Sequence, residues 1–224
     1  MAIVSHKHRI VFFPLAKNCS TSLKYFFYEL DTGRPFRRVK ARFNLPGHIH
    51  TYFPTATEEK WLKFYNAYDT MAVVRDPISR FLSAYGNRIV HARALETRGN
   101  VVETLKAKGL STIPDLPSFI DNLEAYVQIS SYTKNHISPQ SSVIGGIFKH
   151  IKHIYPLSKV SEIPSFVLET RGVEIALPHE QSTGPKFKQS DLSAQHLAKL
   201  IDFYSEDYAM LKDYFQPPAL PVQS

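Results

Sequence analysis

The chain has 224 residues, 43% of them hydrophobic and 21% charged, so it is long enough to bury one globular core and its composition does not favour disorder. Its formal net charge of +7 favours anionic partners, such as nucleotides, acidic or sulfated sugars, nucleic acid or an anionic membrane surface. The single cysteine, Cys19, excludes an internal disulfide and a cysteine-based metal site, and it fits a reducing compartment.

The amino-terminal apolar run is about four residues long, too short for the core of a secretory signal. No window approaches the roughly 18 consecutive apolar residues of a membrane span. We therefore expect a soluble, cytoplasmic protein with no integral membrane segment. A single domain over residues 1–224 is expected, with a frayed tail at about 216–224.

Residues 10–30 predict a strand, a polar loop and a helix. Ile10 to Phe13 is a strand-length apolar run, and the apolar residues from Leu23 to Leu30 recur at helical spacing. The loop between them, Lys17 to Ser22, holds a lysine, an asparagine and three hydroxyl residues where the free N–H groups of the helix emerge. Unpaired N–H donors, the positive end of the helix dipole and a lysine together favour an anion site, phosphate above all.

Two polar features follow this helix. Residues 34–42 carry five cations, which form either a solvated basic face or a lip for an acidic acceptor or for cofactor phosphates. His48 and His50 lie two residues apart beside a Pro-Gly turn signal, so their side chains share one side if the backbone is extended. The alternatives for the pair are incidental loop or core histidines, or a metal site with no third ligand identifiable.

A second strand–loop–helix unit spans Thr70 to Ile89. The apolar run ends at Val74, Arg75 follows it, and helical spacing resumes after Pro77, which suits a first helical turn. Ligands of open α/β sheets bind at the carboxyl ends of strands, so Arg75 and the loop after residue 13 face one rim. Arg75 is alternatively a structural partner of Asp76, and Ser83 a plain serine on the helix surface.

The rest of the chain alternates helical and polar stretches. Lys186 and Lys188 lie in a late polar loop, where they either close over a nucleotide or are simply exposed. The pattern predicts a helix extension followed by a surface insertion within 91–114, and helices at 118–128, 161–170 and within 192–215. It also predicts a strand at 147–155 and loops at 135–146 and 179–190.

The phosphate-loop motif of nucleoside-triphosphate enzymes, GxxxxGK[ST], is missing, and no glycine precedes Gly33. No acidic residue closes the second strand as a magnesium ligand; Arg75 stands there instead. The sequence therefore indicates a nucleotide held by cations and hydroxyls, with no metal.

Four ordered blocks resemble the sulfotransferases that depend on 3′-phosphoadenosine 5′-phosphosulfate (PAPS). The likeness is to the carbohydrate group that includes heparan-sulfate 2-O- and chondroitin- or dermatan-type enzymes, in a soluble bacterial-type form. The blocks are PLAKNCSTSLK, VVRDPISRFLSAY, NHISPQSSV followed by IYPLSKVSEI, and YSEDYAMLKDYF.

The resemblance implies an α/β fold with a central parallel sheet flanked by helices, like that of P-loop nucleotide kinases. It also implies PAPS as donor, adenosine 3′,5′-bisphosphate (PAP) as product and a carbohydrate acceptor, with no metal and no nucleic acid partner. Lys17 would contact the bridging oxygen and 5′-phosphate, and Arg75 and Ser83 would hold the 3′-phosphate. The other donor-binding residues implied or suggested are Asn18, Cys19, Ser20, Thr21, Ser22 and Lys186.

For the general base the resemblance implies His48, because Gly47-His48 matches a glycine-histidine segment of the 2-O-sulfotransferases. Pro46 departs from the histidine that often precedes that glycine, and His50 is the second candidate or, alternatively, an acceptor contact. His136 and Gln140 either line the acceptor cleft or brace their loop. Two other functions stay open: an atypical nucleotide kinase or phosphotransferase, and a basic module that binds polyanions through residues 34–42.

Overall fold

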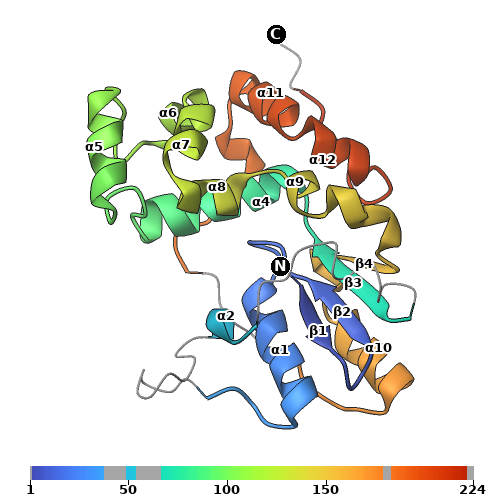
Figure 1. Cartoon of the computed structure of the whole chain (residues 1–224). Helices are drawn as coiled ribbons and strands as arrows, with labels where there is room; N and C mark the ends of the chain where they lie inside the picture. Colours follow the sequence, from blue (N-terminus) through green and yellow to red (C-terminus); the bar gives the residue numbers. More distant parts are fainter. Residues whose placement is uncertain (1, 38–48, 54–66, 179–182, 221–224) are drawn as a thin grey trace. The chain divides into compact units, whose positions relative to one another are not determined.

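The computed structural model describes residues 2–37, 49–53, 67–178 and 183–220, within 49–53 without the side chains of His50 and Thr51. These residues fall into two compact units (Figure 1). The first unit comprises the described parts of 1–75 and 146–181, and the second those of 76–145 and 182–224. A single functional domain over the whole chain stays a prediction.

The first unit contains a four-stranded sheet in the order β1-β2-β3-β4. β2 (Ile10–Phe13), β3 (Asp69–Val74) and β4 (His153–Pro156) are parallel neighbours, which confirms the strands predicted at 10–13 and 70–74. β1 (Ile3–Ser5) adds an antiparallel edge strand that the sequence analysis missed, so the sheet is mostly and not wholly parallel. The strand predicted at 147–155 is wrong in its first part, because 145–150 form a 3-10 helix.

One face of this sheet is the core of the first unit. Ile10, Phe12, Met71 and Val73 alternate along β2 and β3, and they share a hydrophobic cluster with α1 (Ser20–Thr32) and α10 (Glu162–Arg171). Phe12 stacks on Phe27 of α1 with ring centroids 5.1 Å apart. The short helix α2 (Ile49–Tyr52) contacts α1, where the rings of Tyr52 and Tyr28 lie 4.6 Å apart. The predicted helix at 161–170 is thus confirmed, and Gly172 caps it at φ 66°.

The second unit is helical in its described part, and its core contains Phe81, Phe119, Tyr126 and Tyr204. Three expectations for it are corrected. The insertion at 91–114 contains a helix that buries Val101 and Leu105, the helix at 118–128 is two helices broken at Asn122, and most of the expected loop at 135–146 is helical. The terminal helices within 192–215 are confirmed. The helices are α4 (Pro77–Ala84), a π-helix (Tyr85–His91), α5 (Gly99–Ala107), α6 (Leu116–Asp121), α7 (Leu123–Ile129), α8 (Ser131–Ile137), α9 (Ser141–Ile144), α11 (Ala194–Phe203) and α12 (Ser205–Met210).

Short 3-10 helices also occur at Leu157–Lys159 and Gln189–Asp191. Within the described ranges, no helix is both long and apolar enough to cross a membrane.

A charged cluster closes the amino end of β3. Asp69 accepts a hydrogen bond from His153 at 3.1 Å and pairs with Arg171. Burial raises the pKa of Asp69, but hydrogen bonds from His153 and Arg171 outweigh it, so the pKa lies below its usual value. Since the pKa is depressed in the folded state, the stabilisation is complete above the unfolded value near 3.9 and is lost as the pH falls through the folded value.

Asp69→Asn is therefore expected to lower the free energy of unfolding by about 1–2 kcal/mol at pH 7 and by less at pH 3, which lies below the unfolded pKa. Urea unfolding at the two pH values measures the difference. The exposed Asp202→Asn serves as the matched control and should change neither value appreciably. An equal loss at pH 7 and pH 3 would contradict the assignment of the carboxylate.

Candidate functional site

The loop after β2 has an unusual backbone for a segment without glycine. Lys17 has φ 69° and Cys19 has φ 58°, both in the left-handed region that glycine usually occupies. Such conformations cost on the order of 1–3 kcal/mol each and persist where the surroundings hold them. Asn18 between them is fully buried, and its Nδ2 donates to the carbonyl of Val73 at 2.8 Å. The end of β3 therefore fixes the path of this loop.

Helix α1 begins directly after the loop, and no hydrogen bond from the side chain of the capping residue, Cys19, closes its amino end. The first intrahelical bond runs from the N–H of Leu23 to the carbonyl of Cys19 at 3.1 Å. The N–H groups of the first turn, at residues 20–22, precede this bond, and the first turn contains no acidic residue. N–H donors at the positive end of a 13-residue helix suit an anion, and anion binding by Lys17 to Ser22 stays a prediction.

Arg75 contacts this loop. Its Nη1 donates to the carbonyl of Lys17 at 3.2 Å, because β2 and β3 are parallel neighbours and their carboxyl ends meet at one edge. The structure thus brings together Lys17, Asn18 and Arg75, all predicted donor-binding residues. The guanidinium also has a structural role, since it binds the loop backbone.

Asp76, the alternative partner considered for Arg75, is the N-cap of α4. Its Oδ1 accepts from the N–H of Ser79 at 2.8 Å, and its Oδ2 accepts from the hydroxyl of Tyr208 at 3.1 Å. Burial, followed by the charge of Asp76, raises the pKa of the Tyr208 hydroxyl. Ser83 lies half-buried in α4 of the second unit, and its predicted contact with a 3′-phosphate stays a prediction.

The segment that carries Lys186 packs on the π-helix that follows Ser83. Nδ2 of Asn87 donates to the carbonyl and hydroxyl of Thr183, at 2.9 and 3.0 Å. Gly86 allows this approach, since a Cβ there would lie 2.2 Å from the carbonyl oxygen of Pro185. The segment of Lys186 is therefore held against the π-helix of the same unit, and the side chain of Lys186 is exposed.

His136 and Gln140 occupy a braced segment of the second unit. Gln140 is 1% exposed, and its N–H and Nε2 donate to the carboxylate of Asp207 at 2.9 and 3.4 Å. The ring of His136 lies 4.6 Å from that of Tyr132, and its Nδ1 bonds the Tyr132 carbonyl at 2.9 Å. This geometry matches the bracing alternative for Gln140. Substrate contact by either residue stays a prediction.

The structure describes the two histidines predicted as bases only in part. His48 lies outside the described residues, as does most of the basic segment 34–42, apart from the exposed Arg34 and Arg37. His50 belongs to α2, so the extended backbone considered for the His48–His50 pair does not hold at His50. The assignment of the base stays a prediction.

The family model described as the sulfotransferase family matches residues 1–214. This chain belongs to the sulfotransferase family. The match spans both units, so the family resemblance seen in the four sequence blocks is confirmed. Comparison with curated proteins and with solved structures gives no match.

Two buried cations of this sulfotransferase were missed from the sequence. Lys24 in α1 is 5% exposed, and burial lowers the pKa of its ammonium. Arg80 in α4 is 2% exposed and binds backbone carbonyls. Lys24 lies three residues before Phe27, beside the apolar stripe of the helix, and this spacing could have indicated its burial. No sequence pattern indicated the burial of Arg80, because the carbonyls that it binds lie 56–58 residues further along the chain.

Proposed function

We propose that this sulfotransferase transfers the sulfuryl group of PAPS to a hydroxyl of a carbohydrate acceptor. The observation that carries the proposal is the amino end of α1, which begins at a loop that contains Lys17 and binds Arg75. Family membership supports the reaction class. The resemblance of the four blocks supports the donor and the acceptor class.

The donor, when bound, supplies the sulfuryl group and a phosphate leaving group. In the proposed reaction a bond forms between the acceptor oxygen and sulfur, the bond from sulfur to the 5′-phosphate oxygen breaks, and the acceptor proton passes to a base. Lys17 stabilises the negative charge that develops on the leaving phosphate, and the N–H groups of residues 20–22 add donors preorganised by α1. Arg75 binds the 3′-phosphate through its planar guanidinium.

His48 is proposed to accept the proton of the acceptor hydroxyl, since an imidazole titrates near neutral pH. His48→Ala is expected to leave PAP affinity unchanged and to reduce transfer by about 10²–10⁴-fold. Radiolabelled sulfate transfer and PAP titration measure the two quantities. The exposed His91→Ala is the control, and normal turnover of His48→Ala would move the assignment to His50 or elsewhere.

Arg75→Ala is expected to weaken PAP binding by about 10–100-fold, because a hydrogen-bonded charge contributes about 1.5–3 kcal/mol. Isothermal titration without metal measures the affinity. Arg75→Lys keeps the charge without the planar fork and should fall between wild type and Arg75→Ala. The exposed Arg93→Ala should bind as wild type; an unchanged affinity of Arg75→Ala would remove Arg75 from the donor site.

Thermal unfolding with three ligands tests the proposed function. PAP with a metal chelator should raise Tm by roughly 5–10 °C at about 100 times its Kd. ATP with Mg²⁺ should have a smaller effect, and a polyanion should act only at low salt. Stabilisation by ATP with Mg²⁺ above that by PAP would favour the nucleotide-kinase alternative, and a response to polyanions alone would favour the basic module.

A further inference from the structure

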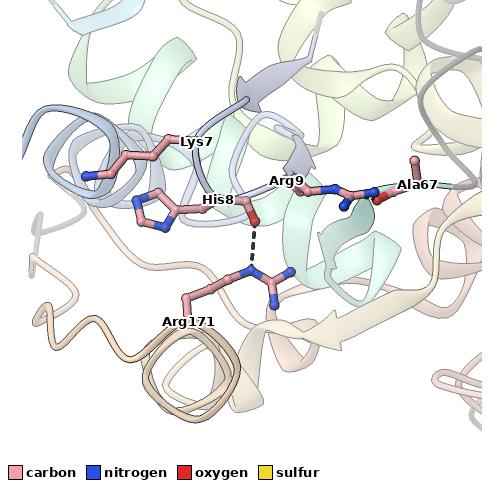
Figure 2. A pocket seen from close by; sticks show the side chains of 5 residues that line it. All are labelled: Lys7, His8, Arg9, Ala67 and Arg171. Atoms are coloured by element: carbon pink, nitrogen blue, oxygen red, sulfur yellow. Dashed lines mark hydrogen bonds between the residues drawn. The ribbon is translucent and has the colours of Figure 1, made fainter.

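A cavity of about 440 Å³ lies at the edge of the sheet opposite the Lys17 loop. It is lined by Lys7, His8, Arg9, Ala67 and Arg171 (Figure 2). Lys7 to Arg9 immediately precede β2, Ala67 lies just before β3, and Arg171 is the last residue of α10. All of them belong to the first unit. The four residues of β2 separate this edge from the loop edge by about 13 Å at roughly 3.3 Å per residue. The cavity is therefore distinct from the proposed donor site.

Positive charge borders this cavity on both sides. In Figure 2 the side chains of Lys7 and Arg9 extend to either side of His8. Arg171 donates through Nε to the His8 carbonyl at 2.7 Å, and its charge is offset by its pair with Asp69. Within the described part of the chain, no carboxylate forms an ion pair with Lys7 or Arg9. The cavity wall therefore carries two cations that form no ion pair, although Asp31 lies close enough to Lys7 for electrostatic attraction.

The backbone that presents these cations is fixed. Arg9 has φ 54°, a left-handed conformation that a non-glycine residue rarely adopts, and its carbonyl accepts from the N–H of Asp69 at 2.9 Å. Its Nε donates to the carbonyl of Ala67 at 3.1 Å, and its guanidinium lies over the ring of Tyr68. His8 is 8% exposed and its Nε2 bonds the Leu30 carbonyl at 3.0 Å. The turn between β1 and β2 thus holds Lys7 and Arg9 in place without using all their donors.

We propose that this cavity binds the ester group of a sulfated or phosphorylated saccharide. Because the two side chains extend to opposite sides of His8, Arg9 supplies charge-assisted donors to the ester oxygens and Lys7 supplies donors to the sugar hydroxyls. The volume falls within the range of about 300–1,000 Å³ typical of small-molecule sites and exceeds what a bare oxyanion needs, so it admits the sugar as well. Among the described residues that line the cavity there is no phenylalanine, tyrosine or tryptophan ring on which a nucleobase would stack, which favours a saccharide over a nucleotide as the carrier.

Amide NMR of the full-length ¹⁵N-labelled protein tests this proposal, with PAP present at saturation to occupy the donor site. Glucose 6-sulfate and glucose 6-phosphate are titrated separately, with glucose as the neutral control. We expect saturable shifts at the amides of Lys7, His8, Arg9 and Ala67 with at least one ester and none with glucose. A response to one ester alone identifies the sulfate or the phosphate as the source.

Lys7→Gln/Arg9→Gln should weaken this binding at least tenfold, while Lys159→Gln, an exposed exchange elsewhere in the first unit, should leave it unchanged. The single variant Lys7→Gln, which leaves Arg9 and its backbone untouched, should show an intermediate loss if the double variant does not fold. No saturable shift at these amides, or an unaltered affinity of the variants, would overturn the proposal. Neither result depends on whether the chain uses PAPS, since the readout is local to the cavity.

Discussion

Lys17→Ala is expected to reduce sulfuryl transfer by about 10²–10³-fold, which corresponds to roughly 3–4 kcal/mol of lost transition-state stabilisation. The ammonium acts on charge that develops on the leaving phosphate, so its removal should lower kcat more than it raises KM. Steady-state transfer of labelled sulfate from PAPS measures both constants. The prediction rests on the place of Lys17 in the loop, whose backbone Asn18 and Arg75 fix from the end of β3.

Two controls separate the charge of Lys17 from its backbone conformation. Lys17→Arg keeps a cation at φ 69° and should retain more activity than Lys17→Ala. Lys159→Ala removes an exposed lysine and should have no effect, because its pair with Glu162 at 3.7 Å lies on the surface. A Lys17→Ala enzyme with normal kcat would exclude this lysine from the chemistry.

Arg80→Ala is expected to lower the free energy of unfolding by about 3–5 kcal/mol. The buried guanidinium donates to the carbonyls of His136 and Ile137, at 3.2 and 3.1 Å, and to that of Ser138. These carbonyls end α8, where helix geometry leaves them without intrahelical partners. Removal of Arg80 would leave the part-buried carbonyls of His136 and Ser138 without this donor, at about 1–3 kcal/mol each. The Ile137 carbonyl, by contrast, keeps a hydrogen bond from the Tyr204 hydroxyl at 2.6 Å.

Urea unfolding measures the loss, with Arg98→Ala as the control. Arg98 is exposed and lies over the ring of Tyr132, with 4.8 Å from its Cζ to the ring centroid, so its removal should change stability by about 1 kcal/mol or less. Arg80→Ala should also shift the amide signals of Ile137 and Ser138, whose N–H groups share peptide units with the tethered carbonyls of His136 and Ile137. A loss below about 1 kcal/mol would mean that water replaces the guanidinium.

Much of the first unit could be predicted from the sequence. The continuous apolar run at 10–13 and the helical spacing of apolar residues from Leu23 to Leu30 are both local patterns, and the strand and the helix that they predict both form. Arg75 was placed correctly at the end of a strand for the same reason. Its contact with the Lys17 carbonyl follows from strand pairing, which local periodicity does not encode.

The failures come from interactions between distant residues. β1 has three residues and depends on its pairing with β2, so its own sequence carries no period long enough to detect. The helices within 135–146 form in a stretch with Pro139 and two glycines because Arg80 and Asp207 satisfy its backbone groups from elsewhere in the chain. Gly86 lies inside a helical pattern and is explained by the close approach of Pro185.

The candidate site shows the same division. The loop residues and Arg75 were predicted as site residues from their positions after strands. Lys24 and the cavity beside Arg9 were not predicted, because burial and concavity arise from tertiary packing. The left-handed backbone of Lys17 and Cys19 was also unexpected, since propensity assigns such positions to glycine.

Transfer from ³⁵S-labelled PAPS to a panel of glycans, in the presence of a metal chelator, tests the central claim most directly. The account predicts labelled glycan and PAP in equal amounts with at least one acceptor, and loss of both products in Lys17→Ala. Absence of PAP binding by the wild-type protein, or transfer that is unaltered in Lys17→Ala, would contradict it.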